Sequence, residues 1–212
     1  SPASGVDIVS GDGLAEVMTG ADVIVDVANS PSFEDGPALD FFTRAARNLQ
    51  AAGQAAGVSH YVALSVVGTD RLQDSGYFRA KAAQEELIRG GAIPFTIVRA
   101  TQFFEFIGAI ADAATSDDTV RISTAPSQPM AADDVATAVA RAAVGQPVGM
   151  VEVAGPERVG LDELVTLQLR ARGDDRAVLA DRAAAYFGVV LDDRTLVAAD
   201  DAVIYATTFA DW

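Results

Sequence analysis

The sequence has no cysteine, one histidine (His60) and one lysine (Lys81) among its 212 residues. Without cysteine the chain cannot form disulfides, Cys-ligated zinc sites, iron–sulfur clusters or thiol nucleophiles. A single histidine cannot build a His-rich metal site, and a structural role is favoured for His60 because it lies mid-strand without a catalytic partner. We therefore expect no metal site. The acidic pairs are expected in exposed turns: Asp117-Asp118, Asp174-Asp175 and Asp192-Asp193.

Basic residues are also scarce. Lys and Arg number 15 against 30 Asp and Glu, which gives a net charge of -15. Such a field repels a nucleic acid duplex, so nucleic acid is not an expected partner. No apolar run approaches the roughly 18–20 residues of a membrane span, and the N-terminus lacks a signal-peptide pattern. We expect a cytoplasmic protein that does not bind membranes.

Half of the residues are hydrophobic, which predicts a sizeable core and excludes disorder as the global description. Short β-rich runs alternate with Ala-rich helical stretches, a pattern typical of βαβ units. The expected fold is α/β, a doubly wound parallel sheet in which the strands at 22–28 and 58–65 are adjacent and parallel. Further strands are expected at 6–9, 95–99, 120–123 and 150–153, and helices at 12–19, 37–56, 75–89, 103–114, 133–144, 161–172 and 177–187.

Tyr77 and Lys81 lie four residues apart on the helix expected at 75–89, so both side chains emerge on one face. A tyrosine phenol has a pKa of about 10. A neighbouring ammonium would lower that pKa by stabilising the phenolate, which suits general acid or base catalysis near neutral pH. Ser65 ends a predicted strand, where ligands bind in parallel sheets, and its hydroxyl is placed to orient a carbonyl.

The spacing Y-x-x-x-K is a weak signal by itself, but the composition sharpens it. Fourteen of the 15 cations are arginine, and the only lysine stands at position 81. This choice favours a position that needs a compact ammonium with an adjustable pKa. The alternative is that Lys81 is a solvated helix residue paired with Glu85, and that Tyr77 is a half-buried aromatic.

Ser65, Tyr77 and Lys81, with the strands around them, resemble the short-chain dehydrogenase/reductase superfamily. The likeness is to its atypical branch, the NmrA-like and sugar-nucleotide epimerase-like NAD(P)-binding proteins. It extends over nearly the whole chain through GADVIV (20–25), PFTIVR (94–99), ADDVA (132–136) and VAGPE (153–157). It implies one Rossmann-like NAD(P)-binding domain over 1–212, with residues 101–131 and 155–212 contributing a small, largely C-terminal substrate-binding portion.

The resemblance also implies roles for individual residues. In this family the lysine holds the nicotinamide ribose, the tyrosine exchanges a proton and the serine positions the substrate oxygen, which assigns Lys81, Tyr77 and Ser65. The further cofactor-binding residues implied are Asp12, Ala28, Asn29 and Thr101, and the substrate-binding residues are Gln102, Phe103 and Phe106. Helix capping is an alternative for Asp12, as is core packing for at least one phenylalanine of 103–106. The implied cofactor is NADP or NAD, with a slight preference for NADP because Ser1–Ser4 carries no acid.

One departure from the family is large. The Gly-rich fingerprint that cradles the pyrophosphate is absent, because Gly5, Gly11, Gly13 and Gly20 do not fit its spacing and no strand precedes them. We expect that the chain is N-terminally incomplete and lacks one βα unit of about 30 residues.

The function favoured by this pattern is an NAD(P)H-dependent oxidoreductase that acts on a small carbonyl compound or a quinone. The main alternative is an NmrA-like sensor, which binds the dinucleotide without turnover and regulates a partner. A nucleotide-sugar epimerase-like enzyme is a third reading, weakened by the short C-terminal half. The expected partner is a small-molecule substrate, and a homodimer is left open.

Overall fold

A computed structural model describes residues 2–212, which fold into two compact units. Unit 1 comprises the described part of Ser1–Ser65 together with Gln73–Arg99 and Thr137–Val151. Unit 2 comprises Val66–Leu72, Ala100–Ala136 and Glu152–Trp212. Residues 101–131 and 155–212, which were predicted to form the substrate-binding portion, therefore belong to unit 2, and their role stays a prediction.

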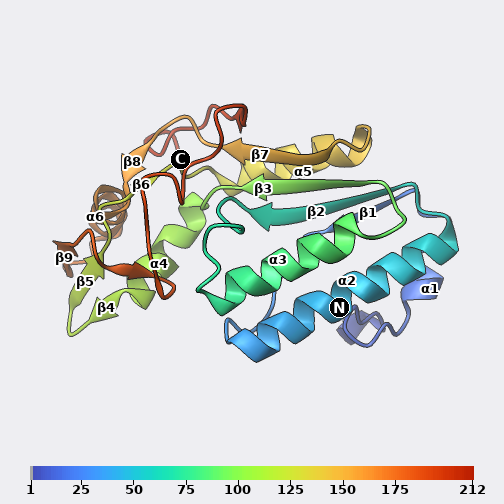
Figure 1. The fold of residues 1–212 in the computed structure, drawn as a ribbon. Helices are drawn as coiled ribbons and strands as arrows, with labels where there is room; N and C mark the ends of the chain where they lie inside the picture. Colours follow the sequence, from blue (N-terminus) through green and yellow to red (C-terminus); the bar gives the residue numbers. More distant parts are fainter. Residues whose placement is uncertain (1) are drawn as a thin grey trace. The chain divides into compact units, whose positions relative to one another are not determined.

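The first half of the chain alternates helices with strands, as the sequence pattern predicts (Figure 1). A left-handed glycine, Gly57 with φ 78°, ends the long helix α2 and lets the chain turn into the next strand. The elements are η1 (Pro2–Ser4), α1 (Leu14–Val17), β1 (Val23–Asp26), α2 (Asp35–Ala56), β2 (His60–Val66), α3 (Gly76–Arg89) and β3 (Phe95–Ala100).

The second half is more irregular and contains many two-residue strands. Its helices are η2 (Phe104–Phe106), α4 (Ile107–Ala113), α5 (Ala132–Val144) and α6 (Leu161–Arg172). Its strands are β4 (Thr115–Ser116), β5 (Thr119–Ile122), β6 (Pro126–Ser127), β7 (Gly149–Ala154), β8 (Val159–Gly160), β9 (Ala177–Ala180), β10 (Ala185–Tyr186), β11 (Val189–Val190) and β12 (Val203–Ile204).

The main sheet has five strands in the order β1-β2-β3-β7-β12. β1 and β2 are adjacent and parallel, with Val23 opposite His60 and Asp26 opposite Ala63, which confirms the predicted pairing. β12 pairs with β7, also in parallel. The predicted doubly wound α/β fold is confirmed, because helices flank this central parallel sheet.

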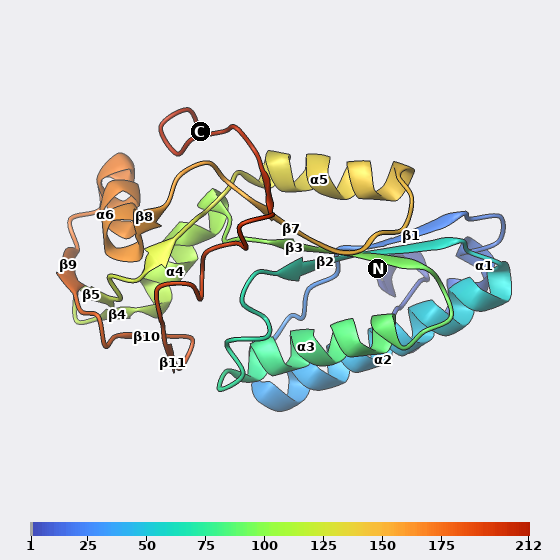
Figure 2. The ribbon, with the colours of Figure 1, turned by 45° about the horizontal axis from the view of Figure 1, so that its top comes forward.

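Helices α2 and α3 run side by side on one face of the sheet in unit 1, and residues 137–144 of α5 lie on the other face (Figures 1 and 2). Coverage on both faces explains why β2 is buried along most of its length. The core between the sheet and the helices contains Ile24, Leu49, Tyr61, Ile88 and Ile97.

β1 is the outermost strand of the sheet among the described residues. Val25 and Val27, at the end of this strand and just beyond it, are 45% and 57% exposed. The expectation that a further βα unit precedes residue 1 stays a prediction. No helix within residues 2–212 combines the length and the apolar character required to span a bilayer.

Two predicted elements are wrong. Residues 6–7 are irregular and residues 8–9 lie in a turn rather than a strand, because the Asp7 carboxylate accepts the Val9 amide at 2.7 Å and so competes with strand pairing. The stretch 177–187 is not a helix, because Ala177–Ala180 pairs in parallel with Thr119–Ile122. Its Ala-rich composition is overridden by this long-range pairing. The helix predicted at 103–114 begins as the 3₁₀ turn η2 and continues as α4.

Candidate functional site

The start of α3 places Tyr77 close to the start of α2. Gly76 is the first residue of α3, and a Cβ at this position would lie 1.6 Å from Asp35 Oδ1 and 2.8 Å from Asp35 Cα. Only glycine permits so close an approach of the two helix starts. Arg79 reinforces the contact, since its Nη2 donates to Asp35 Oδ2 at 2.5 Å. The local sequence therefore holds Tyr77 against α2.

The Tyr77 ring lies among three phenylalanines, with centroid distances of 5.2 Å to Phe33, 5.9 Å to Phe42 and 5.5 Å to Phe78. Its hydroxyl donates a hydrogen bond to Asn29 Oδ1 at 3.0 Å. Asn29 is exposed and follows the carboxyl end of β1. The structure thus brings together two residues that the sequence analysis assigned to catalysis and to cofactor binding.

Burial raises the pKa of Tyr77 to about 12. The expectation that the Lys81 ammonium would lower this pKa is wrong. The reason is geometric, because Nζ of Lys81 donates to Leu64 O and Gln84 Oε1. Tyr77 therefore keeps its proton at neutral pH.

Lys81 is 3% exposed, so the alternative of a solvated helix lysine is wrong. Its Nζ lies 3.0 Å from Leu64 O, 2.5 Å from Gln84 Oε1 and 4.6 Å from the centroid of the Phe42 ring. Burial lowers the pKa of Lys81 to about 8, and the charges of Asp26 and Glu85 oppose this fall. Two of the three N–H donors of the ammonium are used by these contacts, which leaves one for a ligand.

Ser65 is buried in a different hydrogen-bond cluster. Its hydroxyl donates to Glu85 Oε1 at 2.6 Å. Arg99 holds the same carboxylate through Nε at 2.9 Å and Nη2 at 2.8 Å, and Arg89 adds a bond of 2.7 Å. The structure therefore groups Tyr77 with Lys81 around Phe42, whereas it turns the Ser65 hydroxyl to Glu85. The substrate-positioning role of Ser65 stays a prediction.

The other cofactor candidates of unit 1 differ in their surroundings. Ala28 is partly buried, and its amide donates to Asp26 Oδ1 at 3.1 Å. Asp12 is exposed and accepts a hydrogen bond from the Ser10 hydroxyl at 2.7 Å. It is not the cap of α1, because Gly13 occupies that position and makes no side-chain cap bond. No contact within residues 2–212 joins Asp12 to Tyr77 or Lys81.

Unit 2 holds the remaining predicted residues. Thr101 and Gln102 are 1% and 5% exposed, and the Thr101 hydroxyl and both amide atoms of Gln102 have no hydrogen-bond partner among the described residues. Phe103 is partly buried and Phe106 is 37% exposed. Core packing applies instead to Phe104, whose ring contacts Phe209 and Trp212 at 5.3 Å and 5.6 Å between centroids.

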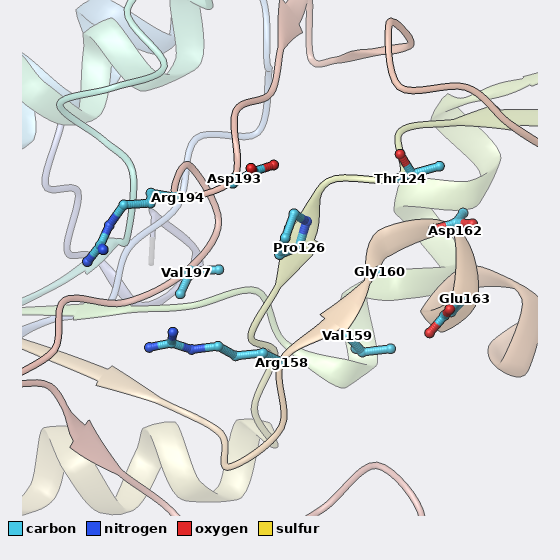
Figure 3. A pocket seen from close by; sticks show the side chains of 10 residues that line it. All are labelled: Thr124, Pro126, Arg158, Val159, Gly160, Asp162, Glu163, Asp193, Arg194 and Val197. Carbon is cyan, nitrogen blue, oxygen red and sulfur yellow. The ribbon is translucent and has the colours of Figure 1, made fainter.

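Unit 2 also contains an open pocket of about 520 Å³ (Figure 3). The carboxylates of Asp162 and Glu163 lie on one side of it, and the side chains of Arg158 and Arg194 lie on the other. The wall further includes Thr124, Pro126, Val159, Gly160, Asp193 and Val197. Both charge signs in a pocket of this size suit a small polar ligand.

Two further residues of unit 1, Asp26 and Gln84, are functional candidates that the sequence pattern did not predict. Both are buried, at 4% and 1% exposure, and Gln84 Nε2 donates to Asp26 Oδ2 at 2.9 Å. A signal existed for Asp26, since its carboxylate interrupts the apolar run at 22–28. None existed for Gln84, whose partner lies 58 residues away.

The Asp117-Asp118 pair lies in an exposed turn, as predicted, and the structural role of His60 stays a prediction. His60 is 3% exposed and its Nε2 lies 2.9 Å from Thr96 Oγ1. Asp117 and Asp118 form a turn with positive φ values of 47° and 57°. Residues 2–212 contain no group of three or more His, Asp or Glu side chains placed to hold a metal ion.

A family model described as NAD(P)H-binding matches residues 3–146, which is more than half of the chain. The chain belongs to this NAD(P)H-binding family. NAD(P)H is therefore the cofactor class, as predicted, whereas the preference for NADP over NAD stays a prediction. The match also supports the predicted resemblance to the atypical short-chain dehydrogenases/reductases. No curated protein matches the sequence.

Three solved structures illustrate the fold that this chain shares. RMD from Pseudomonas aeruginosa, complexed with NADPH, is 15% identical with a TM-score of 0.62, over 83% of this chain and 73% of that one. The dTDP-4-dehydrorhamnose reductase of Bacillus anthracis str. Ames, complexed with NADP, is 14% identical with a TM-score of 0.66, over 84% and 72%. WbmG of Bordetella bronchiseptica, complexed with NAD and UDP, is 16% identical with a TM-score of 0.62, over 88% and 69%. At these identities the likeness establishes the fold.

The donor chemistry of unit 1 fits a dinucleotide of the NAD(P)H-binding family. Lys81 keeps one N–H, and Asn29 Nδ2 is not engaged in any hydrogen bond within the described residues. Asn29 also follows the carboxyl end of a parallel strand, where such ligands bind. The pyrophosphate cradle is absent from residues 2–212, because Gly11 and Gly13 follow turns and precede only the four-residue helix α1.

Proposed function

We propose that this protein is an NAD(P)H-dependent oxidoreductase that reduces a small carbonyl compound or a quinone. The observation that carries the proposal is the pair Tyr77 and Lys81, which meet the same ring of Phe42 from one face of α3. NAD(P)H, when bound, would supply the hydride, and Tyr77 would donate the matching proton to the substrate oxygen. A carbonyl becomes an alcohol and a quinone becomes a hydroquinone.

The protonation states in unit 1 favour reduction. Tyr77, with a pKa raised to about 12, carries a proton to give at neutral pH. Lys81, with a pKa of about 8, is mostly charged at pH 7 and titrates just above it. A charged Lys81 would offer its remaining N–H to the ribose hydroxyls of the dinucleotide.

The pocket of unit 2 supports a small polar substrate. It lies within the part of the chain that the sequence analysis assigned to substrate binding, and its wall contains both arginines and carboxylates. Gln102, Phe103 and Phe106 remain the proposed substrate contacts from the same unit. The unpartnered amide atoms of Gln102 supply both a donor and an acceptor for a polar ligand.

A second candidate function is a dinucleotide sensor without turnover, and one observation favours it. The Ser65 hydroxyl is bound to Glu85 rather than turned toward Tyr77, and catalysis would lose the group predicted to orient the substrate oxygen. A sensor needs only Lys81 and the loop around Asn29. The two functions therefore differ in what they require of the Tyr77 hydroxyl.

The deciding experiment measures NAD(P)H oxidation with a panel of aldehydes, ketones and quinones, and dinucleotide affinity by calorimetry. Tyr77→Phe removes one hydroxyl, so we expect the rate to fall by roughly 10²-fold with nearly unchanged affinity, the scale of a lost general acid. Tyr205→Phe, in unit 2, is the matched control and should change neither value. Tight dinucleotide binding without oxidation of any substrate would reject the enzyme and favour the sensor.

A further inference from the structure

A chain of hydrogen bonds in unit 1 connects Lys81 to the end of β1. Nζ of Lys81 donates to Gln84 Oε1 at 2.5 Å, and Gln84 Nε2 donates to Asp26 Oδ2 at 2.9 Å. The Tyr61 hydroxyl donates to the same oxygen at 2.9 Å, and the Ala28 amide donates to Asp26 Oδ1 at 3.1 Å. Three elements, β1, β2 and α3, thus contribute side chains to one buried chain.

The chemistry of the amide gives this chain a direction. Asp26 receives three donors, so its carboxylate acts as an acceptor and must face the NH₂ end of Gln84. The carbonyl end of Gln84 then has to point at Lys81. Reversing the amide would place an oxygen against the carboxylate and an NH₂ group against the ammonium, which would lose both bonds.

Burial makes this series of hydrogen bonds costly to form and hard to rearrange. Asp26, Tyr61, Lys81 and Gln84 are 4%, 0%, 3% and 1% exposed. Buried charges are tolerated only when they are paired and fully hydrogen-bonded, so each member restricts the others. Leu64 O is the second acceptor of the ammonium at 3.0 Å, and the centroid of the Phe42 ring lies 4.6 Å from Nζ.

We propose that Gln84 and Asp26 are positioning residues that hold the Lys81 ammonium in place for its ligand. Gln84 sets the direction of Nζ by direct contact, and Asp26 acts through Gln84 and through its negative charge. That this ligand is the ribose of NAD(P)H rests on the proposed function. The positioning itself rests on contacts within the protein.

The charges around Lys81 support the same arrangement. Burial lowers its pKa to about 8, and the Asp26 carboxylate from β1 is the larger of the two charges that oppose the fall. The other is Glu85 on α3 itself, which Arg99 and Arg89 already pair. From α2 the group in contact is the uncharged Phe42. Asp26 is therefore the carboxylate that keeps the ammonium protonated near neutral pH.

Because Lys81 is the only lysine, the inference can be tested without cofactor or substrate. Lysine labelled with ¹³C at Cε gives one side-chain NMR signal, whose pH titration reports the pKa of this single ammonium. The wild type should titrate near the pKa of about 8. Asp26→Asn, which is nearly isosteric, should lower the value by about one unit or more, because burial then acts with less opposition.

Gln84→Met provides a second variant that leaves the Asp26 charge in place. It removes only the acceptor and should also lower the pKa and broaden the Cε signal, because Nζ loses its fixed partner. Asp40→Asn, an exposed carboxylate on α2 paired with Arg44, is the control and should leave the titration unchanged. Proton–nitrogen spectra verify that each variant is folded. An unchanged Lys81 titration in both folded variants would overturn the proposal.

The same samples separate this inference from the proposed function. If calorimetry finds no NAD(P)H binding to the wild type while Asp26→Asn shifts the titration, the positioning chain stands and the proposed function fails. If binding and oxidation are intact but neither variant moves the titration, the proposed function stands and the positioning chain fails. When the proposed function and the positioning role are both correct, dinucleotide affinity should be lost at high pH as Lys81 loses its proton. In Asp26→Asn this loss should begin at a lower pH, in parallel with the lower Lys81 pKa.

Discussion

The hydroxyl of Tyr77 donates to Oδ1 of Asn29 at 3.0 Å, across 48 residues of sequence. This bond ties the exposed loop after β1 to the first turn of α3. Asn29 Oδ1 also accepts the Ser30 amide at 3.0 Å, so the amide plane of Asn29 is fixed by its own loop. Tyr77 is thereby aimed at a surface position although its ring is packed among phenylalanines.

Asn29 should therefore control the orientation of the Tyr77 hydroxyl. Asn29→Ala removes the acceptor, and we expect the rate of NAD(P)H oxidation to fall by about 10-fold because the proton donor is less well aligned. Asn29→Asp keeps an oxygen in the same place, so the rate of NAD(P)H oxidation should fall less than in Asn29→Ala. Steady-state kinetics check both, with Ser32→Ala in the same loop as the control. Equal rates for Asn29→Ala and the wild type would exclude this orienting role.

Lys81 should lower the stability of the fold near neutral pH. Its folded-state pKa of about 8 lies below the ordinary lysine value of 10.5. Below pH 8 both states are protonated, and the folded state bears the full cost of a buried charge. Between pH 8 and 10.5 the unfolded state binds more protons, so wild-type stability rises with pH.

Lys81→Met should consequently be more stable than the wild type at pH 7, by roughly 1–3 kcal/mol, with the difference shrinking as pH rises above 8. Urea unfolding at pH 6, 7 and 9.5 measures it. Arg47→Met, an exposed cation on α2, is the control and should show no such trend. The same Lys81→Met variant should bind NAD(P)H weakly. If Lys81→Met were less stable than the wild type at both pH 7 and pH 9.5, the buried charge of Lys81 would not be what lowers stability.

The cluster around Glu85 should be a stability element rather than a catalytic one. Arg99 and Glu85 have side chains 7% and 2% exposed, and their ion pair is bidentate. Arg99→Met leaves a buried carboxylate with less compensation and should cost about 3–5 kcal/mol of unfolding free energy.

Adding Glu85→Gln should recover part of the Arg99→Met loss, because the uncompensated charge disappears. Urea unfolding of the single and double variants gives the coupling energy. The exposed pair of Arg44 and Asp40 is the comparison, where Arg44→Met should cost less than about 1 kcal/mol. A double variant that is less stable than the Arg99→Met single variant would show that the charge is not the cause.

Filling the pocket of unit 2 should weaken substrate binding and leave dinucleotide affinity unchanged. Thr124 is exposed and lines the pocket, so Thr124→Trp adds bulk without disturbing the core. We expect KM for the reducible substrate to rise by about 10-fold. Dinucleotide affinity by calorimetry should stay unchanged. Val190→Trp, an exposed position of the same unit outside the pocket, is the control. A KM unaffected by Thr124→Trp would remove this pocket from consideration as the substrate site.

Much of the fold was predictable because its signals are local. The apolar runs at 22–28 and 58–65 contain the paired strands β1 and β2, and the helix predicted at 37–56 ends at Gly57. The stretch 177–187 was not predictable in the same way. Its first four residues are held by pairing with β5, which lies about 58 residues earlier in the register from Thr119 to Ala177. Helical composition cannot compete with a strand partner that only the folded chain provides.

The spacing of Tyr77 and Lys81 on one helix face was determined by the sequence alone, because helical periodicity requires no information from elsewhere in the chain. The sequence alone also determined that Lys81 is its only lysine and that cysteine chemistry is excluded. The tertiary structure decided how these groups are protonated and what they face. It raised the pKa of Tyr77, lowered that of Lys81 and turned Ser65 to Glu85, since burial and long-range hydrogen bonds exist only after distant segments have packed together.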